Sequence, residues 1–181
     1  MNKRIICILL FWLIVAAGCT PKIVITSEPA PDFHLARYRT FAFYEVAASG
    51  TGLEENDKPK VALLQNEIAR QLQARGLQQV TQNPDLLVNI GIVVEEKVQT
   101  RQTNFVTDPP TYIGQRRYTW KSKEVEVGRY KTGTVTLDLV NPDRNELVWQ
   151  GTAESILQEK DKKLQEQVAK GIQELISRVP Q

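Results

Sequence analysis

Few residues in this chain have side chains and spacing suited to chemistry, and the clearest is a cysteine near the start. Cys19 directly follows the small residues Ala16-Ala17-Gly18. Ahead of them lie a basic start, residues 1–4, and an apolar run of about 13 residues, shorter than the roughly 20 that a membrane-spanning helix needs. This order is typical of a bacterial signal peptide whose cleavage leaves a lipid-modified cysteine at the new N-terminus. We therefore predict a lipoprotein signal peptide over residues 1–18 and lipidation of Cys19.

Two other interpretations of this segment remain open: an uncleaved membrane anchor, or an ordinary secretory signal cut elsewhere. The short apolar run favours a signal peptide over a span. In the lipoprotein interpretation, residues 19–22 form a lipidated tether that spans at most about 10 Å. We expect a location in the bacterial cell envelope, held in the membrane by the N-terminal lipid. Thr20 in place of an Asp after the cysteine favours the outer membrane, facing the periplasm, over the inner membrane if enterobacterial sorting applies.

The inventory of nucleophiles and metal ligands is small. Cys7 leaves with the signal and Cys19 is acylated, so no thiol remains for a disulfide, a metal or catalysis. His34 is the single histidine, and one imidazole makes neither a His-rich metal site nor an acid–base pair. We expect it to be exposed or partly packed. The sequence also lacks HExxH, GxSxG, P-loop and GxGxxG motifs. These observations predict no metal, no cofactor and no enzymatic activity.

The charge balance excludes a general affinity for polyanions. The chain has 23 basic and 21 acidic side chains, and Lys3 and Arg4 lie in the predicted signal, so the remaining chain carries 21 of each sign. A neutral domain offers no global attraction to nucleic acid. Any attraction to an anionic surface must therefore come from local clusters.

One local cluster combines basic and aromatic residues near the middle of the chain. Arg and aromatic side chains are frequent anchors at interfaces, and basic residues are attracted to anionic head groups. The segment is therefore a candidate contact for the membrane or an envelope protein partner. The alternative, which ordinary strand alternation favours, is a solvated hairpin whose aromatic rings cover the sheet. Its members are Arg116, Arg117, Tyr118, Trp120, Lys121 and Lys123.

A second polar arrangement involves Asp138 and the motif Trp149-Gln150-Gly151. On adjacent strands, Asp138 and Gln150 would form a polar pair facing a ligand. The alternative is structural, with Trp149 as a core aromatic and Gly151 marking a bulge or a close backbone approach. Ordinary sheet packing favours the structural interpretation.

Hydrophobic periodicity predicts two amphipathic helices and several strands. The first helix is capped at Asn56 or Asp57 and ends at Gly76, with Val61, Leu64, Ile68 and Leu72 on one face. The second helix covers residues 160–178, with Leu164, Val168, Ile172, Leu175 and Val179 as its apolar stripe. Strands are expected at residues 22–26, 39–46, 86–98, 125–140 and 146–153, with a mobile polar excursion over 99–123 that contains a strand near 117–121.

The alternation within these strands predicts which side chains share a face. In the second strand, Phe41 and Phe43 face one side, and Ala42, Tyr44 and Val46 the other. In the last strand, Leu147, Trp149 and Ala153 share a face. The order of elements predicts an α+β fold: a mainly antiparallel sheet with both helices packed on one face, as a two-layer sandwich. Residues 23–181 form this single domain.

Three ordered segments resemble one family of bacterial lipoproteins, domain-of-unknown-function family 4136. They are Asp32-Phe33 with Tyr38 and Thr40-Phe41; Leu72-x-Ala74-x-Gly76 with Pro84-Asp85-Leu86; and Gly133-Thr134 through Leu137-Asp138-Leu139-Val140 with Leu147-Val148-Trp149-x-Gly151. Asn141 departs from the acidic residue frequent in the family before the turn. The resemblance implies an α+β envelope domain over about residues 23–180, with no assigned enzymatic activity.

The function that these features favour is a non-catalytic, membrane-anchored envelope lipoprotein that serves as a binding or interaction module. The alternative is an auxiliary subunit of an envelope lipid or solute transport system, by analogy of fold plan alone. In both cases the partners are the membrane, through the N-terminal lipid, and an envelope protein or anionic lipid. Nucleic acid is not among them.

Overall fold

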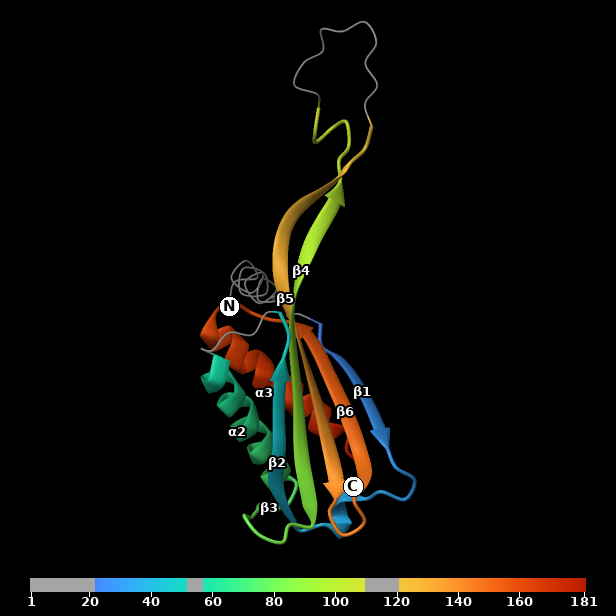
Figure 1. Cartoon of the computed structure of the whole chain (residues 1–181), viewed down its shortest axis with the longest axis vertical. Coiled ribbons are helices and arrows are strands. Elements are labelled where there is room, and N and C mark those ends of the chain that lie inside the picture. The colour runs from blue at the N-terminus through green and yellow to red at the C-terminus, as the bar shows by residue number, and fades with distance from the viewer. Residues whose placement is uncertain (1–21, 52–56, 110–120) are drawn as a thin grey trace, which may run out of the picture.

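A six-stranded mixed sheet, covered on one face by two helices, forms the body of the protein in the computed structural model, which describes residues 22–51, 57–109 and 121–181 (Figure 1). The strands are β1 (Val24–Pro29), β2 (Thr40–Ser49), β3 (Gln78–Gln79), β4 (Leu86–Gln102), β5 (Glu124–Asn141) and β6 (Glu146–Ile156). They lie in the order β1-β6-β5-β4-β2-β3. The pairs β2–β4 and β2–β3 are parallel and the others antiparallel, so the predicted α+β class with a mainly antiparallel sheet is confirmed.

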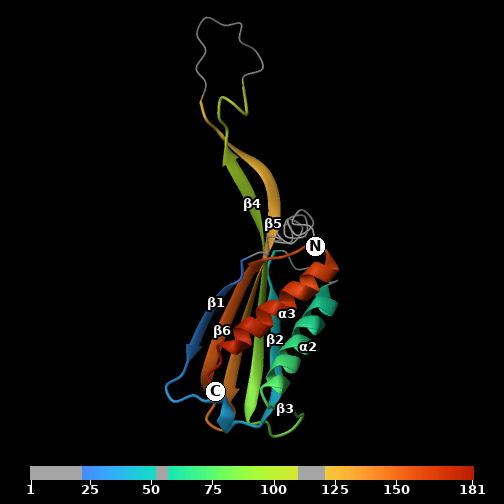
Figure 2. The ribbon, with the colours of Figure 1, turned by 180° about the vertical axis from the view of Figure 1, so that it is seen from behind.

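Both helices, α2 (Lys58–Ala74) and α3 (Asp161–Ser177), lie on the same face of the sheet, as Figure 2 shows from behind. A short 3₁₀ turn, η2 (Leu35–Arg37), joins β1 to β2. The predicted stripes are confirmed, because Leu64, Ile68 and Leu72 of α2 are buried, as are Leu164, Ile172, Leu175 and Val179 of the second stripe. Ile176 is also buried, which widens that stripe by one residue.

The start and end of α2 follow from its terminal residues. Asp57 lies at the N-cap position, and its Oδ1 accepts a hydrogen bond from Lys60 Nζ at 2.6 Å. Gly76 ends the helix with a φ of 95°, a left-handed conformation that glycine adopts without strain. At this end, the Arg75 guanidinium donates to the carbonyls of Ile176 and Val179 at 2.6 and 2.9 Å. This side chain ties the C-terminal ends of the two helices together.

Two bulges correct the predicted strand faces. In β2 the register shifts between Phe43 and Glu45, so Tyr44 is the extra residue and is 72% exposed. The shift turns Val46 to the face of Phe43, where it packs against the core, instead of leaving it beside Tyr44.

In β6 the register shifts beside Leu139 and makes Val148 the extra residue. Val148 is buried and Leu147 is 47% exposed, so the prediction that Leu147 shares the face of Trp149 was wrong. The neighbouring strand β1, at the edge of the sheet, continues to Pro29 instead of ending at residue 26 as predicted. An edge strand tolerates proline because one side of it has no ladder partner.

The strands β4 and β5 continue beyond the body as a two-stranded arm, which we define as residues 96–108 and 121–131. β6 pairs with β5 as far as Thr132, opposite Ile156, whereas β4 and β5 pair with each other out to Gln102 and Glu124. The arm rises from one end of the sheet (Figure 1). The prediction that the strand ends at residue 98 was therefore wrong, and most of the strand expected near 117–121 lies outside the described residues.

Candidate functional site

The start of the described chain lies beside the base of the arm. Cys19 is outside the described residues. Val24, the first residue of β1, lies opposite Glu154, and Glu154 lies opposite Thr134. Thr134 in turn faces Val93, three residues before the arm begins in β4. The N-terminal end of the domain and the arm therefore share one end of the sheet.

The described part of the predicted basic–aromatic cluster lies at the far end of the arm. Of its six members, Lys121 and Lys123 are described and both are exposed. The other four, Arg116, Arg117, Tyr118 and Trp120, lie outside the described residues.

Two hydrogen bonds between Thr103 and Lys123 join the two sides of the arm just beyond the ends of β4 and β5. Lys123 N–H donates to Thr103 Oγ1 at 2.8 Å, and Thr103 N–H donates to the Lys123 carbonyl at 2.8 Å. The two described lysines are thus carried at the end of a hydrogen-bonded ribbon.

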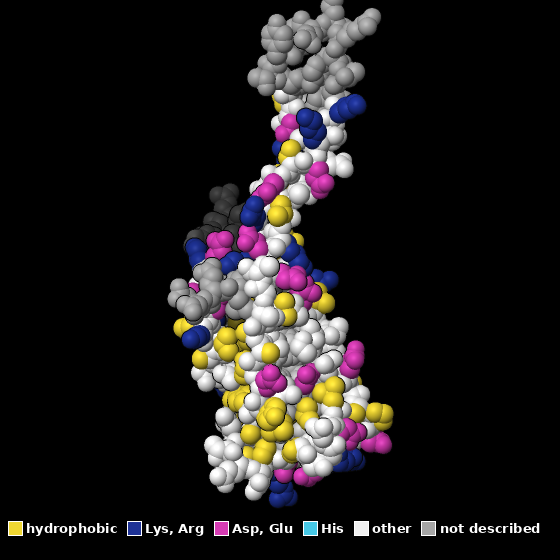
Figure 3. All heavy atoms as spheres, in the orientation of Figure 1, with side chains coloured by type: hydrophobic (Ala, Val, Ile, Leu, Met, Phe, Trp, Pro, Cys, Tyr) yellow, Lys and Arg dark blue, Asp and Glu magenta, His cyan; other side chains and the backbone are white. Residues whose placement is uncertain are grey.

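Charged side chains along the arm pair with one another (Figure 3). Arg129 contacts Glu126 at 2.8 Å and Glu96 at 3.5 Å. The Arg101 guanidinium Nη1 donates a hydrogen bond to Asp108 Oδ2 at 2.6 Å. This bond lowers the pKa of Asp108 well below its ordinary range. These ion pairs compensate part of the charge on the described arm.

Apolar side chains on the arm, by contrast, are exposed. Val98 and Val127 are 49% and 47% exposed, and Phe105 and Val106 near the end of the arm are 57% and 87% exposed. An isolated two-stranded ribbon is at best marginally stable in water. These exposed apolar residues make the arm a candidate contact surface.

The pair Asp138 and Gln150 does form. Gln150 Nε2 donates to Asp138 Oδ1 at 2.9 Å, and both side chains are half-buried. They lie on the sheet face opposite the helices, which no helix covers in the described part of the chain (Figure 1).

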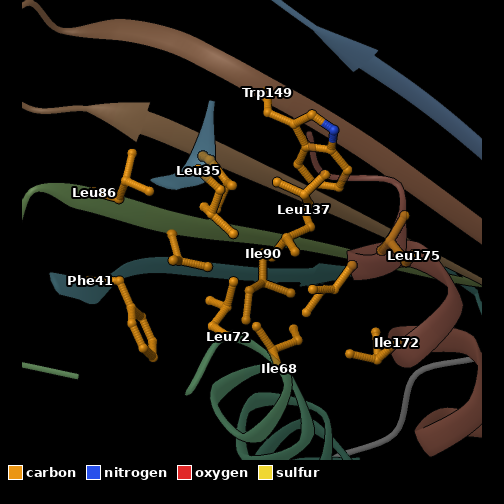
Figure 4. Close-up of a cluster of buried hydrophobic side chains, with 14 of the residues drawn as sticks. Leu35, Phe41, Ile68, Leu72, Leu86, Ile90, Leu137, Trp149, Ile172 and Leu175 are labelled. Carbon is orange, nitrogen blue, oxygen red and sulfur yellow. The ribbon is translucent and has the colours of Figure 1, made fainter. Parts of the chain in front are cut away.

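Trp149 lies on the other face of the sheet, fully buried, with its Nε1 donating to Ser27 Oγ at 2.9 Å. Figure 4 shows its ring in the core with Leu137 and Leu175. The motif is therefore split between the two faces, and Trp149 is a core residue as the structural interpretation expected.

His34 is exposed, and its Nδ1 lies 2.8 Å from the Gln181 carbonyl. Within the described ranges, no group of three or more His, Cys, Asp or Glu residues comes together to hold a metal ion. None of the described helices is long and apolar enough to cross a membrane.

Sequence reasoning missed a cavity of about 600 Å³ at the arm end of the body. Its walls come from the first half of α2, the first two-thirds of α3 and the adjacent sheet. Apolar atoms make up most of the surface of the lining, and its aliphatic residues include Val61, Leu64, Ile92, Val94, Val135, Leu164, Val168 and Ile172. At the opposite end of the sheet, large side chains such as Phe41, Leu86 and Trp149 fill the space under the helices (Figure 4).

Small residues border part of the cavity: Gly133 of β5, Ala153 of β6 and Gly171 of α3. The Leu157 side chain packs over Gly133, whereas a Cβ on Gly171 would only reach ordinary contact with Ile23. Each small residue is ordinary on its own strand or helix. A run of small residues at one end of several elements is the only signal that the sequence offered.

Comparison with known proteins identifies the family and the fold. The family model described as Domain of unknown function (DUF4136) matches residues 25–181. A PDZ domain protein from Parabacteroides distasonis is similar in structure, with a TM-score of 0.52 and 14% identity over 94% of this chain and 39% of that one. The comparison with a PelC dodecamer from Paraburkholderia phytofirmans gives a TM-score of 0.49 and 14% identity, over 86% of this chain and 96% of that one. No curated protein matches the chain. At such identities these likenesses concern the fold alone.

Proposed function

The chain belongs to the DUF4136 family, and we propose that it is a non-catalytic lipoprotein of the bacterial envelope, anchored through Cys19, whose arm contacts the surface of that membrane. The domain acts as a binding module beside the bilayer, on the periplasmic side of the outer membrane. The family description assigns no activity, so this proposal depends on the geometry of the chain itself.

The observation that carries the proposal is the shared end of the sheet. The register row Val24–Glu154–Thr134–Val93 places the N-terminal end next to the base of the arm. The tether of residues 19–22 spans at most about 10 Å. Residues 96–102 of the arm alone span about 20 Å at the rise of a strand. An arm longer than the tether, leaving the anchored end, is brought to the membrane surface.

The chemistry of the arm suits that surface. Val98, Val127 and Phe105 are exposed apolar groups, and a two-stranded ribbon, which is marginally stable by itself, gains stability when such groups are covered. Lys121 and Lys123 at its end can each gain about 1 kcal/mol beside an anionic bilayer. The remaining basic and aromatic members of the cluster would strengthen this contact.

The anchor is tested by labelling cells with a clickable fatty acid. The wild-type protein should carry the tag, and Cys19→Ala should lose it because no other thiol remains in the mature chain. A tag retained in Cys19→Ala would show that the anchor is wrongly assigned.

The contact is tested by photocrosslinking in cells from a single reactive residue on the arm. Val127 and Leu147 are equally exposed, at 47%, and lie at opposite ends of the sheet, so they form a matched pair. We expect lipid adducts from position 127 and none from position 147. Adducts to one protein from position 127 would contradict the lipid contact and favour an envelope protein partner.

A further inference from the structure

The cavity at the arm end of the body is a second feature that membrane anchoring does not use. It is about 600 Å³ in volume and lies between the helix layer and the sheet. Ligand pockets in proteins typically measure roughly 300–1,000 Å³ and are lined mainly by hydrophobic side chains. Apolar surface inside a protein can take up apolar molecules. The lining therefore favours an aliphatic ligand over a polar one.

The cavity also has a defined position relative to the N-terminus. Ile23, which directly precedes β1, lines it, and a Cβ placed on Gly171 of α3 would lie 3.7 Å from Ile23 Cδ1. Residues 20–22 alone separate Ile23 from Cys19. A lipid on Cys19 would thus hold this end of the domain at the level of the head groups.

Most of the charged residues that line the cavity are exposed, whereas its aliphatic residues are buried or half-buried. Lys60, Arg129 and Lys131 contribute positive groups, and Glu96, Glu154 and Asp161 negative ones. Groups of both signs around an aliphatic interior match an amphiphile, whose polar head remains at the border while its chain is buried.

We propose that this cavity takes up one acyl chain of a free membrane lipid. The proposal extends the envelope function above, and it rests on the proposed anchor only for the source of the lipid. The chain on Cys19 itself is needed in the bilayer, so the occupant is a separate lipid molecule. The uptake depends on the space between α2, α3 and β4, whereas the surface contact depends on the arm.

Adjacent residues of β4 supply a matched test. Val94 lines the cavity, and Val93 lies on the opposite face, 38% exposed. Val94→Phe places a ring inside the cavity, and Val93→Phe adds the same ring outside it. The test uses a chain that starts at Thr20, which contains every described element and the entire buried core. The probe is cis-parinaric acid, a long-chain fatty acid that fluoresces in apolar surroundings.

We expect saturable one-to-one binding by the wild type and by Val93→Phe, and an affinity lower by roughly tenfold or more in Val94→Phe. Val168→Phe fills the same cavity from α3 and serves if Val94→Phe does not fold. Absence of binding to the wild type, or equal binding by the Val93 and Val94 variants, would overturn the proposal. So would a lipidated full-length protein that no longer binds the probe, since its own acyl chain would then occupy the cavity. None of these outcomes depends on vesicle binding by the arm.

Discussion

The backbone of Gly151 in β6 lies directly against the indole ring of Trp149, two residues earlier on the same strand. A Cβ added to Gly151 would lie 2.6 Å from Trp149 Cζ2 and 2.8 Å from Leu175 Cδ1, which is too close for either contact. The glycine leaves the space in which the ring folds along the strand, with its Nε1 reaching Ser27 of β1. Trp149 thus links the edge strand β1, through Ser27, to the part of the core beside Leu175 of α3.

We expect Gly151→Ala to lower the free energy of unfolding by about 1–3 kcal/mol, because an overpacked core must shift the ring or the leucine. Gly128→Ala is the control, since a Cβ on Gly128 meets no atom within 4 Å. Urea denaturation measures both. Equal midpoints for the two variants would show that the indole is not confined by Gly151.

Trp149→Ala should cost about 3–5 kcal/mol, as large-to-small changes in cores do, because the ring is fully buried. Leu72→Ala and Leu175→Ala should each cost about 2–5 kcal/mol and set the scale for this core. Chemical denaturation of a chain that starts at Thr20 compares the three. An unchanged midpoint for Trp149→Ala would contradict a structural role.

Arg75→Met should destabilise the domain by about 1.5–3 kcal/mol, because it removes the hydrogen bonds to the Ile176 and Val179 carbonyls. Arg70→Met breaks an exposed surface pair with Glu67 on α2 and should cost far less, because solvent screens such pairs. Thermal unfolding of the two variants gives the comparison. Similar losses would mean that Arg75 does not tie the helix ends.

Asp85 should contribute to the loss of folding stability at acid pH. Its Oδ2 accepts hydrogen bonds from the N–H groups of Arg39 and Thr40 at 2.7 and 3.0 Å, and these bonds lower its pKa below the ordinary value of 3.8. A lowered pKa in the folded state adds stability above the unfolded value, and this stability is lost as the pH falls through the folded value.

We therefore expect Asp85→Asn to be less stable than the wild type at neutral pH, with the difference shrinking below about pH 4. Chemical denaturation across that range measures it, and Glu67 and Asp108, whose pKa values are also lowered, contribute equally to both proteins. A difference that stays constant from neutral to acid pH would show that the Asp85 charge does not hold β2 to β4.

Local patterns predicted the parts of the fold that depend on local order. In α2, Leu64 and Leu72 belong to an apolar stripe at helical spacing, as does Leu175 in α3. In β4 and β5, Ile90 and Leu137 each belong to an alternating apolar pattern. The helices and the central sheet could therefore be predicted. The bulges at Tyr44 and Val148 could not, because each depends on the register with a neighbouring strand.

The arm and the cavity were missed for related reasons. Residues 99–102 are solvated on both faces and therefore show no hydrophobic alternation, although they continue β4. The cavity is lined by residues of both helices and of several strands, which lie far apart in the sequence. No single stretch of the sequence therefore predicts either feature.

The measurement that tests the central claim most directly is co-sedimentation with lipid vesicles of a chain that starts at Thr20. The wild type should bind anionic vesicles weakly and lose that binding as salt rises, and it should hardly bind neutral ones. Replacing Arg116, Arg117, Lys121 and Lys123 with Gln removes about 1 kcal/mol each beside an anionic bilayer. It should therefore abolish the binding and leave the thermal unfolding temperature unchanged. A wild type that ignores anionic vesicles at low salt would contradict the contact between the arm and the membrane.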